Sequence, residues 1–375
     1  MAGAFLNTDE IQVNMGPQHP STHGVLRLVL RTDGEMVRET HPHIGYLHRC
    51  AEKIGELVNV TQYIPYTDRM DYLAAMNNNL AFCLAVERIA GVEVPKRAQY
   101  LRVLAAELNR IASHLVAIGT YALDLGAFTP FCYAFREREL ILEIFERLCG
   151  ARLTYSYMRI GGVMRDIDED LIEDVKVFLH VMENKWPEYN QLLTDNEIFI
   201  RRTAHVGAIP PDRAIANGLT GPCLRGSGVQ FDCRKAFPYS GYEDFQFEVP
   251  IGQGQKGTLG DSWDRYWVRM LEIMQSVSIC RQVIQNLPDG PVMAAVPKVL
   301  KIPDGAECYV PTENPRGELG FYVIGGGKDV LYRCRVRAPS FCNLSITNET
   351  ARDMLMADIV AIVGSFDIVL GEVDR

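Results

Sequence analysis

The sequence predicts an α+β fold in which a central bundle of long helices carries β elements from both chain ends. Three observations predict it. Apolar and β-branched runs flank a Gly- and Pro-containing loop within residues 11–30. Apolar residues then recur at helical spacing through the middle of the chain, and a triple-glycine turn separates two strand-like runs within residues 317–337. Strands repeat every 2 residues and helices every 3.6, which separates these patterns.

The chain organisation follows the same order. A length of 375 residues would allow two to three domains at about 150 residues each, but we expect one continuous structural unit. Its expected parts are an N-terminal β region with a histidine loop (1–43), a helical bundle (44–200), a loop-rich segment with a long helix (201–302), and a C-terminal hairpin, helix and buried tail (303–375).

The N-terminal region contains two histidines four residues apart. Gly16 to Gly24 includes His19 and His23 among glycine and proline residues, so we expect a tight loop between two strands. A second turn is expected at Thr32-Asp33-Gly34. The imidazoles could donate a proton, bind a metal or hydrogen-bond a polar headgroup.

The central helices are predicted by apolar periodicity. Ala98 to Ile118 has leucine, isoleucine and alanine at helical spacing, and Pro95 precedes it as a start signal. Similar patterns occur at 70–90, 131–149, 168–193 and 260–287. Residues 201–256 are rich in Gly, Pro and aromatics and are expected to form loops with short strands. The runs Gly317 to Ile324 and Val330 to Arg337 predict a hairpin.

The C-terminal segment Asp358 to Leu370 is almost wholly apolar, which is typical of an end that is packed down. If the segment is buried, the carboxyl of Asp367 must pair or take up a proton. The alternative is a final edge strand with Asp367 on its solvent face, and strand alternation alone does not separate the two.

Composition excludes several classes of protein. An apolar fraction of 47% and a charged fraction of 23% are those of a folded protein. A net charge of -9 argues against nucleic-acid binding. Met1 to Glu10 has neither a basic start nor an apolar run, so no signal or transit peptide is expected. Ile111 to Leu123, an uncharged stretch, falls short of the roughly 20 residues that a membrane-spanning helix needs.

The ten cysteines are scattered, and no C-x-x-C pair occurs. Zinc and iron–sulfur sites usually take two ligands from one short turn, so we expect no cysteine metal site. Buried thiols are expected instead.

Several motifs together resemble one family over nearly the whole chain: the D-type subunits of proton-pumping NADH:quinone oxidoreductase, respiratory complex I. The matching segments are Gly16 to Leu26, Ile44 to His48, Asp68 to Leu73, Asp124 with Gly126-Ala127, Arg136 to Arg138, Ile160 to Val163, Leu224 to Gly228 and Gly371 to Arg375.

The resemblance implies a fold like the large subunit of nickel–iron hydrogenases, in which two C-x-x-C pairs hold the metal. At the corresponding positions this sequence has Asp71, Ala74, Val369 and Glu372. Without thiolates there is no soft-ligand cage, so we expect no bound metal. In the family the vacated cleft receives the quinone headgroup.

The resemblance also implies residue roles. His23 and Tyr72 would hydrogen-bond the quinone carbonyls, and Asp124 would be the acid partner of His23. His19, Asp367 and Val369 would belong to the same quinone pocket. From the residues alone, Tyr72 is expected to be core on an apolar helix, and Asp124 a surface acid at a helix end.

Two arginines are implied to act on a neighbouring subunit. Arg49 and Arg69 align with arginines close to the terminal 4Fe-4S cluster of the small subunit, where a guanidinium raises the cluster's potential. Without the resemblance both are expected to be solvated or ion-paired. Thr154 stands where several relatives have a titrating histidine, so any pH dependence of that cluster needs another group.

The expected function is that of a peripheral core subunit on the cytoplasmic face of the membrane, or the matrix face in mitochondria. It would form the quinone-reducing site with the cluster-bearing subunit, bind other peripheral-arm and membrane-arm subunits, and couple electron transfer to proton pumping. Three alternatives remain: the quinone-site subunit of a ferredoxin-type membrane oxidoreductase, a metal-binding hydrogenase, or a non-catalytic scaffold.

Overall fold

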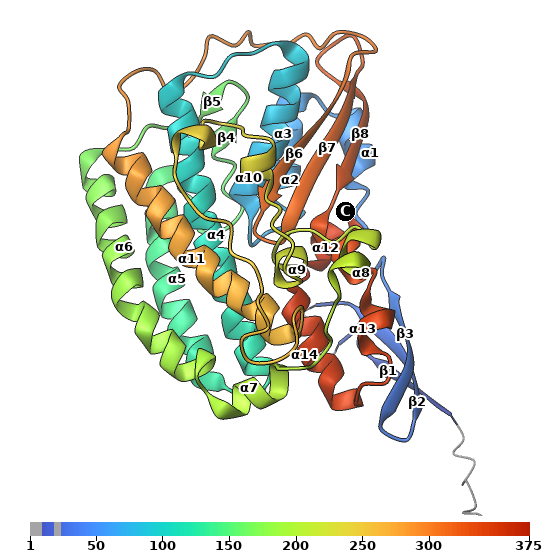
Figure 1. Ribbon diagram of the computed structural model, residues 1–375. Coiled ribbons are helices and arrows are strands. Elements are labelled where there is room, and N and C mark those ends of the chain that lie inside the picture. The colour runs from blue at the N-terminus through green and yellow to red at the C-terminus, as the bar shows by residue number, and fades with distance from the viewer. Residues whose placement is uncertain (1–9, 19–23) are drawn as a thin grey trace, which may run out of the picture.

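The computed structural model describes residues 10–18 and 24–375 and combines helices with three small sheets, which confirms the α+β class (Figure 1). The long helices lie side by side in one half of the molecule, and a three-stranded sheet lies in the other half (Figure 1). The predicted residues His19 and His23 lie outside the described residues.

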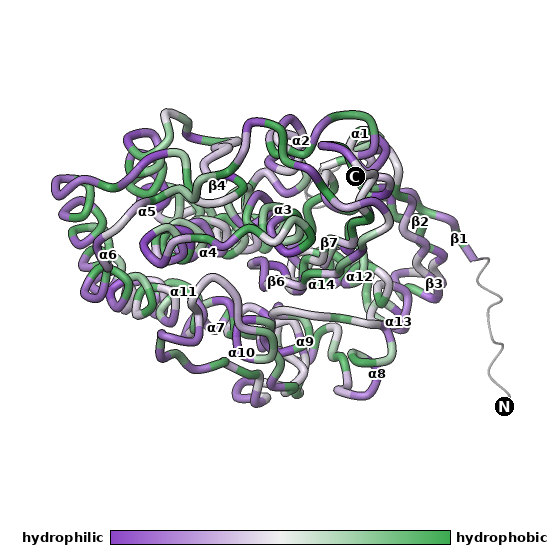
Figure 2. Tube along the Cα trace, turned by 90° about the horizontal axis from the view of Figure 1, so that it is seen from above, coloured by the Kyte–Doolittle hydropathy of each residue, from purple (hydrophilic) through white to green (hydrophobic). Residues whose placement is uncertain are grey.

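The bundle is built around α4, which packs against α5, α11 and α3 (Figure 2). The helix begins directly after Pro95, as predicted, and both its faces are buried, as expected of a core helix. The bundle helices have these bounds: α3 Ala75–Ala90, α4 Lys96–Asp124, α5 Phe128–Cys149, α6 Glu169–Tyr189 and α11 Ser262–Gln285. All five patterns predicted as helices are therefore helical, although α3 begins five residues later than expected.

Shorter elements connect these helices. α1 Ala51–Leu57 and α2 Val60–Thr67 precede α3, and the small hairpin of β4 Met158–Arg159 and β5 Gly162–Val163 follows α5. The π-helical η2 Asn190–Thr194 and the helix α7 Glu197–Thr203 follow α6.

The region 201–256 contains short helices, so the prediction of short strands there was wrong. They are α8 Pro211–Ala216, α9 Pro222–Gly226, α10 Cys233–Ala236 and the 3-10 helix η3 Tyr242–Asp244. Proline occupies the first position of α8 and α9, where its missing N–H costs nothing. The Asp232 carboxylate accepts from the Arg234 N–H at the start of α10.

The C-terminal sheet has the order β6-β7-β8, with β6 Glu307–Asn314, β7 Gly317–Gly325 and β8 Leu331–Arg337. The predicted hairpin is thus confirmed as β7 and β8, whereas β6 was not predicted. Phe321 and Val323 are fully buried, because β6 and β7 pack on α3 while β8 packs on α1.

The N-terminal sheet pairs β1 Ile11–Met15 with β2 Arg27–Asp33, and β2 with β3 Met36–His43. The turn predicted at Thr32-Asp33-Gly34 lies at the β2–β3 connection, where Gly34 has φ +61°. The C-terminal helix α13 packs on β3, which ties the two chain ends together.

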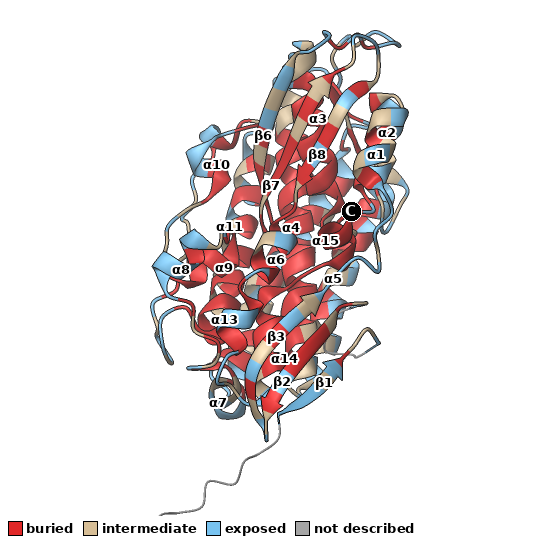
Figure 3. Cartoon of the chain, turned by 90° about the vertical axis from the view of Figure 1, so that its right-hand side faces the viewer, coloured by how far each residue is buried: buried red, intermediate tan, exposed pale blue. Residues whose placement is uncertain are grey.

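The chain end is buried, as predicted, but it is helical. The last helices are α12 Pro339–Leu344, α13 Thr347–Ala351, α14 Met356–Phe366 and α15 Leu370–Asp374. Figure 3 shows α14 and α15 mostly buried and β1 mostly exposed. The edge-strand alternative is therefore wrong: Asp367 is 6% exposed and ends α14 with a φ of 55°.

Among the helices of residues 10–18 and 24–375, none is both long enough and apolar enough to span a bilayer.

Candidate functional site

A cavity of about 520 Å³ lies where four distant segments of the chain meet. These are the turn before α3, the second half of α4, the β6–β7 turn, and the segment that joins α14 to α15. Four residues singled out in the sequence line it: Tyr72, Asp124, Asp367 and Val369. The other lining residues are Leu73, Val116, Thr120, Leu123, Arg316 and Ile368.

Tyr72 lies in a turn and not on a helix, which corrects the expectation from apolar periodicity. The Asp71 carboxylate accepts from the backbone N–H groups of Leu73 and Ala74, both at 3.2 Å. This turn delays the start of α3 and leaves Tyr72 half-buried at the cavity. Burial raises the pKa of the Tyr72 phenol, Arg316 opposes that shift, and Asp71 adds to it. The phenol therefore keeps its proton at neutral pH.

Asp124 is the last residue of α4 and is half-buried. The C-terminal end of a helix carries partial negative charge. A cation beside Asp124 would therefore be favoured twice, by the carboxylate and by the helix end.

A buried arginine joins two acids behind the cavity wall. Arg316 Nη1 lies 2.8 Å from Asp71 Oδ2, and Arg316 Nη2 lies 3.2 Å from Asp367 Oδ1. Ser113 Oγ accepts a further hydrogen bond from Nη1 at 3.1 Å. The Arg316 side chain is fully buried, and its acid partners raise its pKa against the opposing effect of burial. A charge this deeply buried persists because it is paired.

Glu372 is the fourth member of this group and has no cation in hydrogen-bond contact among the described residues. Its Oε2 accepts from the hydroxyl of Ser340 at 2.5 Å and from the Ser340 N–H at 3.3 Å. The same hydroxyl accepts from the N–H of Val369 at 3.3 Å. Burial, reinforced by Asp71, raises the pKa of Glu372 to about 8. We call Asp71, Arg316, Asp367 and Glu372 the cavity cluster.

Sequence reasoning missed Arg316 and Ser340. Arg316 stands in a turn between two strands, where an arginine normally extends into water. Asp71 was noticed only as a replaced metal ligand and not as an ion-pair partner. The one available signal was the excess of acids in the C-terminal and 68–71 segments, since a buried carboxyl needs either a cation partner or a proton.

Arg49 and Arg69 lie beside each other on the surface. Arg49 Nη2 donates to the Arg69 carbonyl, and Arg69 Nη1 donates to the Pro65 carbonyl at 2.6 Å. Both residues are exposed, and neither forms an ion pair with an acid among the described residues. Asp68, adjacent to Arg69, is buried. Burial raises its pKa to about 7, although the hydrogen bond that it accepts from the Ser156 N–H acts to lower it.

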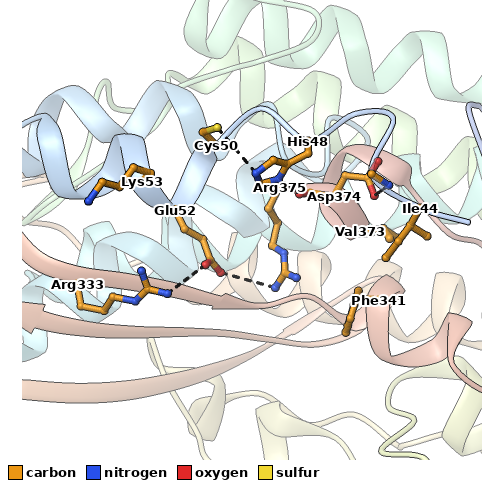
Figure 4. A pocket seen from close by; sticks show the side chains of 11 residues that line it. Ile44, His48, Cys50, Glu52, Lys53, Arg333, Phe341, Val373, Asp374 and Arg375 are labelled. Carbon is orange, nitrogen blue, oxygen red and sulfur yellow. Dashed lines mark hydrogen bonds and ion pairs between the residues drawn. The ribbon is translucent and has the colours of Figure 1, made fainter.

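A second pocket of about 380 Å³ lies at the chain end (Figure 4). Glu52 faces Arg333 and Arg375 there, at 3.6 and 3.7 Å. The Asp374 carboxylate accepts from the N–H groups of Gly45 and Leu47, both at 2.7 Å. These bonds fasten the loop before α1 to α15, and so hold Arg49 in place.

Residues 10–18 and 24–375 contain no group of three or more His, Cys, Asp or Glu side chains arranged to hold a metal ion. All ten cysteines are free, and five of them are buried.

Comparison with known proteins gives one consistent result. The family model described as "Respiratory-chain NADH dehydrogenase, 49 Kd subunit" matches residues 124–306 and 296–375. A D-type subunit of the NADH-quinone oxidoreductase of Cytophaga hutchinsonii is 50% identical, over 99% of this chain and 97% of that protein. The corresponding subunit of Chlorobium luteolum is 51% identical, over 99% and 94%. That of Bacillus cereus is 51% identical, over 99% and 100%.

Proposed function

The chain belongs to the 49 kDa, or D-type, subunit family of NADH-quinone oxidoreductase and is a core subunit of respiratory complex I; from this premise we propose that its cavity receives the quinone headgroup. One observation carries the proposal: Tyr72, Asp124 and Asp367, from three distant segments, line one cavity. An apolar cavity with a few convergent polar groups is the usual form of a small-molecule site.

The cavity suits a headgroup. Leu73, Val116 and Ile368 supply apolar walls, while a phenol, two carboxyls and a guanidinium supply polar contacts. A quinone ring is apolar on its faces and accepts hydrogen bonds only at its two carbonyls. Donors aimed at those oxygens stabilise the negative charge that develops there during reduction.

In the proposed reaction, quinone takes two electrons and two protons and leaves as quinol. Tyr72 donates a hydrogen bond to one carbonyl. The second donor is His23, with Asp124 stabilising its imidazolium, and His19 completes the pocket. Gly24 supports this placement, because a Cβ atom at Gly24 would lie 3.2 Å from Leu370, the neighbour of Val369.

The proposed electron entry is the surface of Arg49 and Arg69, facing the 4Fe-4S cluster of the small subunit. Both are exposed, and neither forms an ion pair with an acid among the described residues, so their charge remains available to raise the potential of a nearby cluster. Thr154 does not titrate in the relevant range.

We also propose that the fold is related to the nickel–iron hydrogenase large subunit, with the metal site replaced. Asp71 and Glu372, which stand where cysteines would be ligands, interact with each other in the buried cavity cluster. Arg316 supplies the positive charge there. The chain would sit on the cytoplasmic or matrix face of the membrane, in contact with other peripheral-arm and membrane-arm subunits.

The experiment compares Tyr72→Phe with wild type in membranes containing the assembled complex. Quinone reduction by NADH is measured beside electron transfer to a water-soluble acceptor that bypasses the quinone site. We expect quinone reduction to fall about 10²-fold, the effect of removing one well-placed donor, while the bypass activity is unchanged. Tyr332→Phe, an exposed tyrosine of β8 that is 74% exposed, is the matched control. Unchanged quinone reduction in Tyr72→Phe would overturn the proposal.

A further inference from the structure

The cavity cluster contains more acids than its cations can neutralise. Three carboxyls, from Asp71, Asp367 and Glu372, surround the single guanidinium of Arg316. One more cation, Arg269, reaches its edge, with Nε 3.9 Å from Asp367 Oδ2. That leaves one carboxyl in excess, and all three are at least nine-tenths buried. A buried and uncompensated carboxylate takes up a proton rather than remain charged.

The contacts identify which carboxyl holds that proton. Asp71 and Asp367 each lie within 3.2 Å of an Arg316 nitrogen, whereas the hydrogen bonds of the Glu372 carboxyl within the described residues are to Ser340 alone. Within the described part of the chain, Glu372 Oε1 and Asp367 Oδ2 are buried without a hydrogen-bond partner. The first is the natural place for a carboxylic O–H, and the second is a vacant acceptor.

The cluster also reaches the cavity. Asp367 and Arg316 line it directly, and the Ser340 hydroxyl joins Glu372 to the backbone of Val369 in its wall. Among the described residues, the charged and titratable groups outside the cluster that face it are Tyr72, Arg49, Arg269 and Cys223. Arg49 lies against α15, with Nη2 3.2 Å from where a Cβ atom of Gly371 would be.

We propose that the cavity cluster stores one exchangeable proton, held by Glu372 in the resting protein, and delivers it through Asp367 to a quinone oxygen during reduction. This inference rests on the proposed function of the cavity. It makes Glu372 a proton donor that acts through Asp367, and therefore a positioning residue.

The step balances. NADH supplies the two electrons through the complex, and the quinone oxygen becomes negative. The O–H bond of Glu372 breaks, the proton passes through the carboxyl of Asp367, and an O–H bond forms on the quinone. The cluster is then one charge more negative, and it regains a proton from water. The other proton of the quinol comes from the Tyr72 and His23 side of the cavity.

The test is the pH profile of NADH:quinone reduction in membranes containing the assembled complex. In wild type, activity should fall as pH rises through about 8, where Glu372 loses its proton. Glu372→Gln cannot release a proton, so kcat should fall about a hundredfold with KM little changed, and this alkaline limb should vanish. Glu372→Asp should restore the limb. Bypass activity should be unaffected in both variants.

Two further variants keep the test decisive. Ser340→Ala removes a hydrogen bond that favours ionised Glu372, so the limb should move to higher pH. Asp264→Asn changes another buried acid whose pKa is raised by burial; it lies outside the cavity and should leave the limb in place.

An infrared difference spectrum of the wild-type complex supplies a readout that needs no variant. On quinone reduction, the carbonyl band of a protonated carboxylic acid should be lost, and it should be absent from Glu372→Gln. Wild-type turnover and an unshifted limb in Glu372→Gln, or no such band in wild type, would overturn the inference. If quinone reduction nevertheless falls in Tyr72→Phe, the proton-storage inference fails but the proposed quinone site is retained. If it does not fall in Tyr72→Phe either, both proposals fail.

Discussion

Two of the buried groups of charges in the described part of the chain are built differently. The first is the cavity cluster. The second, which we call the bundle network, joins α4 and α11 to α9, α10 and β6; its members are Glu107, Arg110, Arg225, Asp232, Arg234, Glu272 and Glu313.

Every acid of the bundle network contacts a cation. Glu107 lies 3.1 Å from Arg234 and 3.2 Å from Arg110, and the hydroxyls of Tyr242 and Ser276 donate to it at 2.6 Å. Burial opposes its ionisation, but the arginines outweigh burial and hold the pKa of Glu107 at about 2. In the cavity cluster, Glu372 has no cation contact among the described residues, and its pKa is raised to about 8.

This difference in charge pairing indicates a different role for each group. Fully paired charges between packed helices stabilise one arrangement of those helices, because any displacement would leave a buried charge without its partner. An incompletely paired group beside a cavity holds a proton that it can lose. We therefore assign the bundle network to structure and the cavity cluster to chemistry.

The largest expected effect is on the bundle network. Glu107→Ala leaves Arg110 and Arg234 facing each other without their acid, and breaking a buried ion pair in this way costs about 3–5 kcal/mol. The variant complex should therefore be scarce in membranes and should inactivate at lower temperature. Normal assembly and an unchanged inactivation temperature would contradict the structural role assigned to the bundle network.

Next in size is Asp367→Asn in the cavity cluster. The amide cannot carry the proton, and Arg316 loses one of its two acid partners. Quinone reduction should fall at least about a hundredfold, the lower end of the usual contribution of an acid–base group, while assembly and bypass activity persist. Asp358→Asn, on the same helix but outside the cavity, is the control. Equal losses of quinone and bypass activity in Asp367→Asn would point to a structural role instead.

A smaller effect concerns stability and pH. The folded chain holds the Glu372 proton between its ordinary pKa of 4.5 and about 8, so the folded state binds more protons than the unfolded state there. Stability contributed at this site therefore falls as pH rises through that window. Glu372→Gln removes the dependence, so thermal inactivation should match wild type near about pH 5 and occur at higher temperature near about pH 9. A variant less stable than wild type at both pH values would contradict this.

The smallest effect is expected at the surface. Arg213 and Glu349 form an exposed ion pair, with Arg213 Nε 2.9 Å from Glu349 Oε2. Solvent and salt screen such pairs, so Arg213→Gln should shift neither the inactivation temperature nor quinone reduction beyond experimental scatter. A clear loss of either would show that charge pairing alone, without burial, matters in this chain.

The parts of the fold that could be predicted are those that a local sequence pattern specifies. The helix α4 was predictable because its apolar repeat and Pro95 are both local signals. The short helices at 211–236 were not predicted, for two reasons. Proline occurs at the start of a helix as well as at the end of a strand, so it does not distinguish the two. A side-chain cap such as that of Asp232 produces no repeat of apolar residues in the sequence.

The site was predictable only in part. The motifs indicated Tyr72, Asp124, Asp367 and Val369, and the structure places all four at one cavity. Periodicity nevertheless placed Tyr72 on a helix, because it does not register the turn that the Asp71 side chain stabilises. Arg316 lies 245 residues from its partner Asp71, and no local pattern contains a contact of that separation.

The most direct test of the quinone site is photolabelling of the assembled complex with a light-activated quinone analogue, followed by mapping of the labelled peptides of this chain. We predict labels in the Tyr72 turn, at the end of α4, and at residues 367–369, all suppressed by excess natural quinone. Labels confined to other surfaces, with these three segments unmarked, would contradict the placement of the headgroup in this cavity.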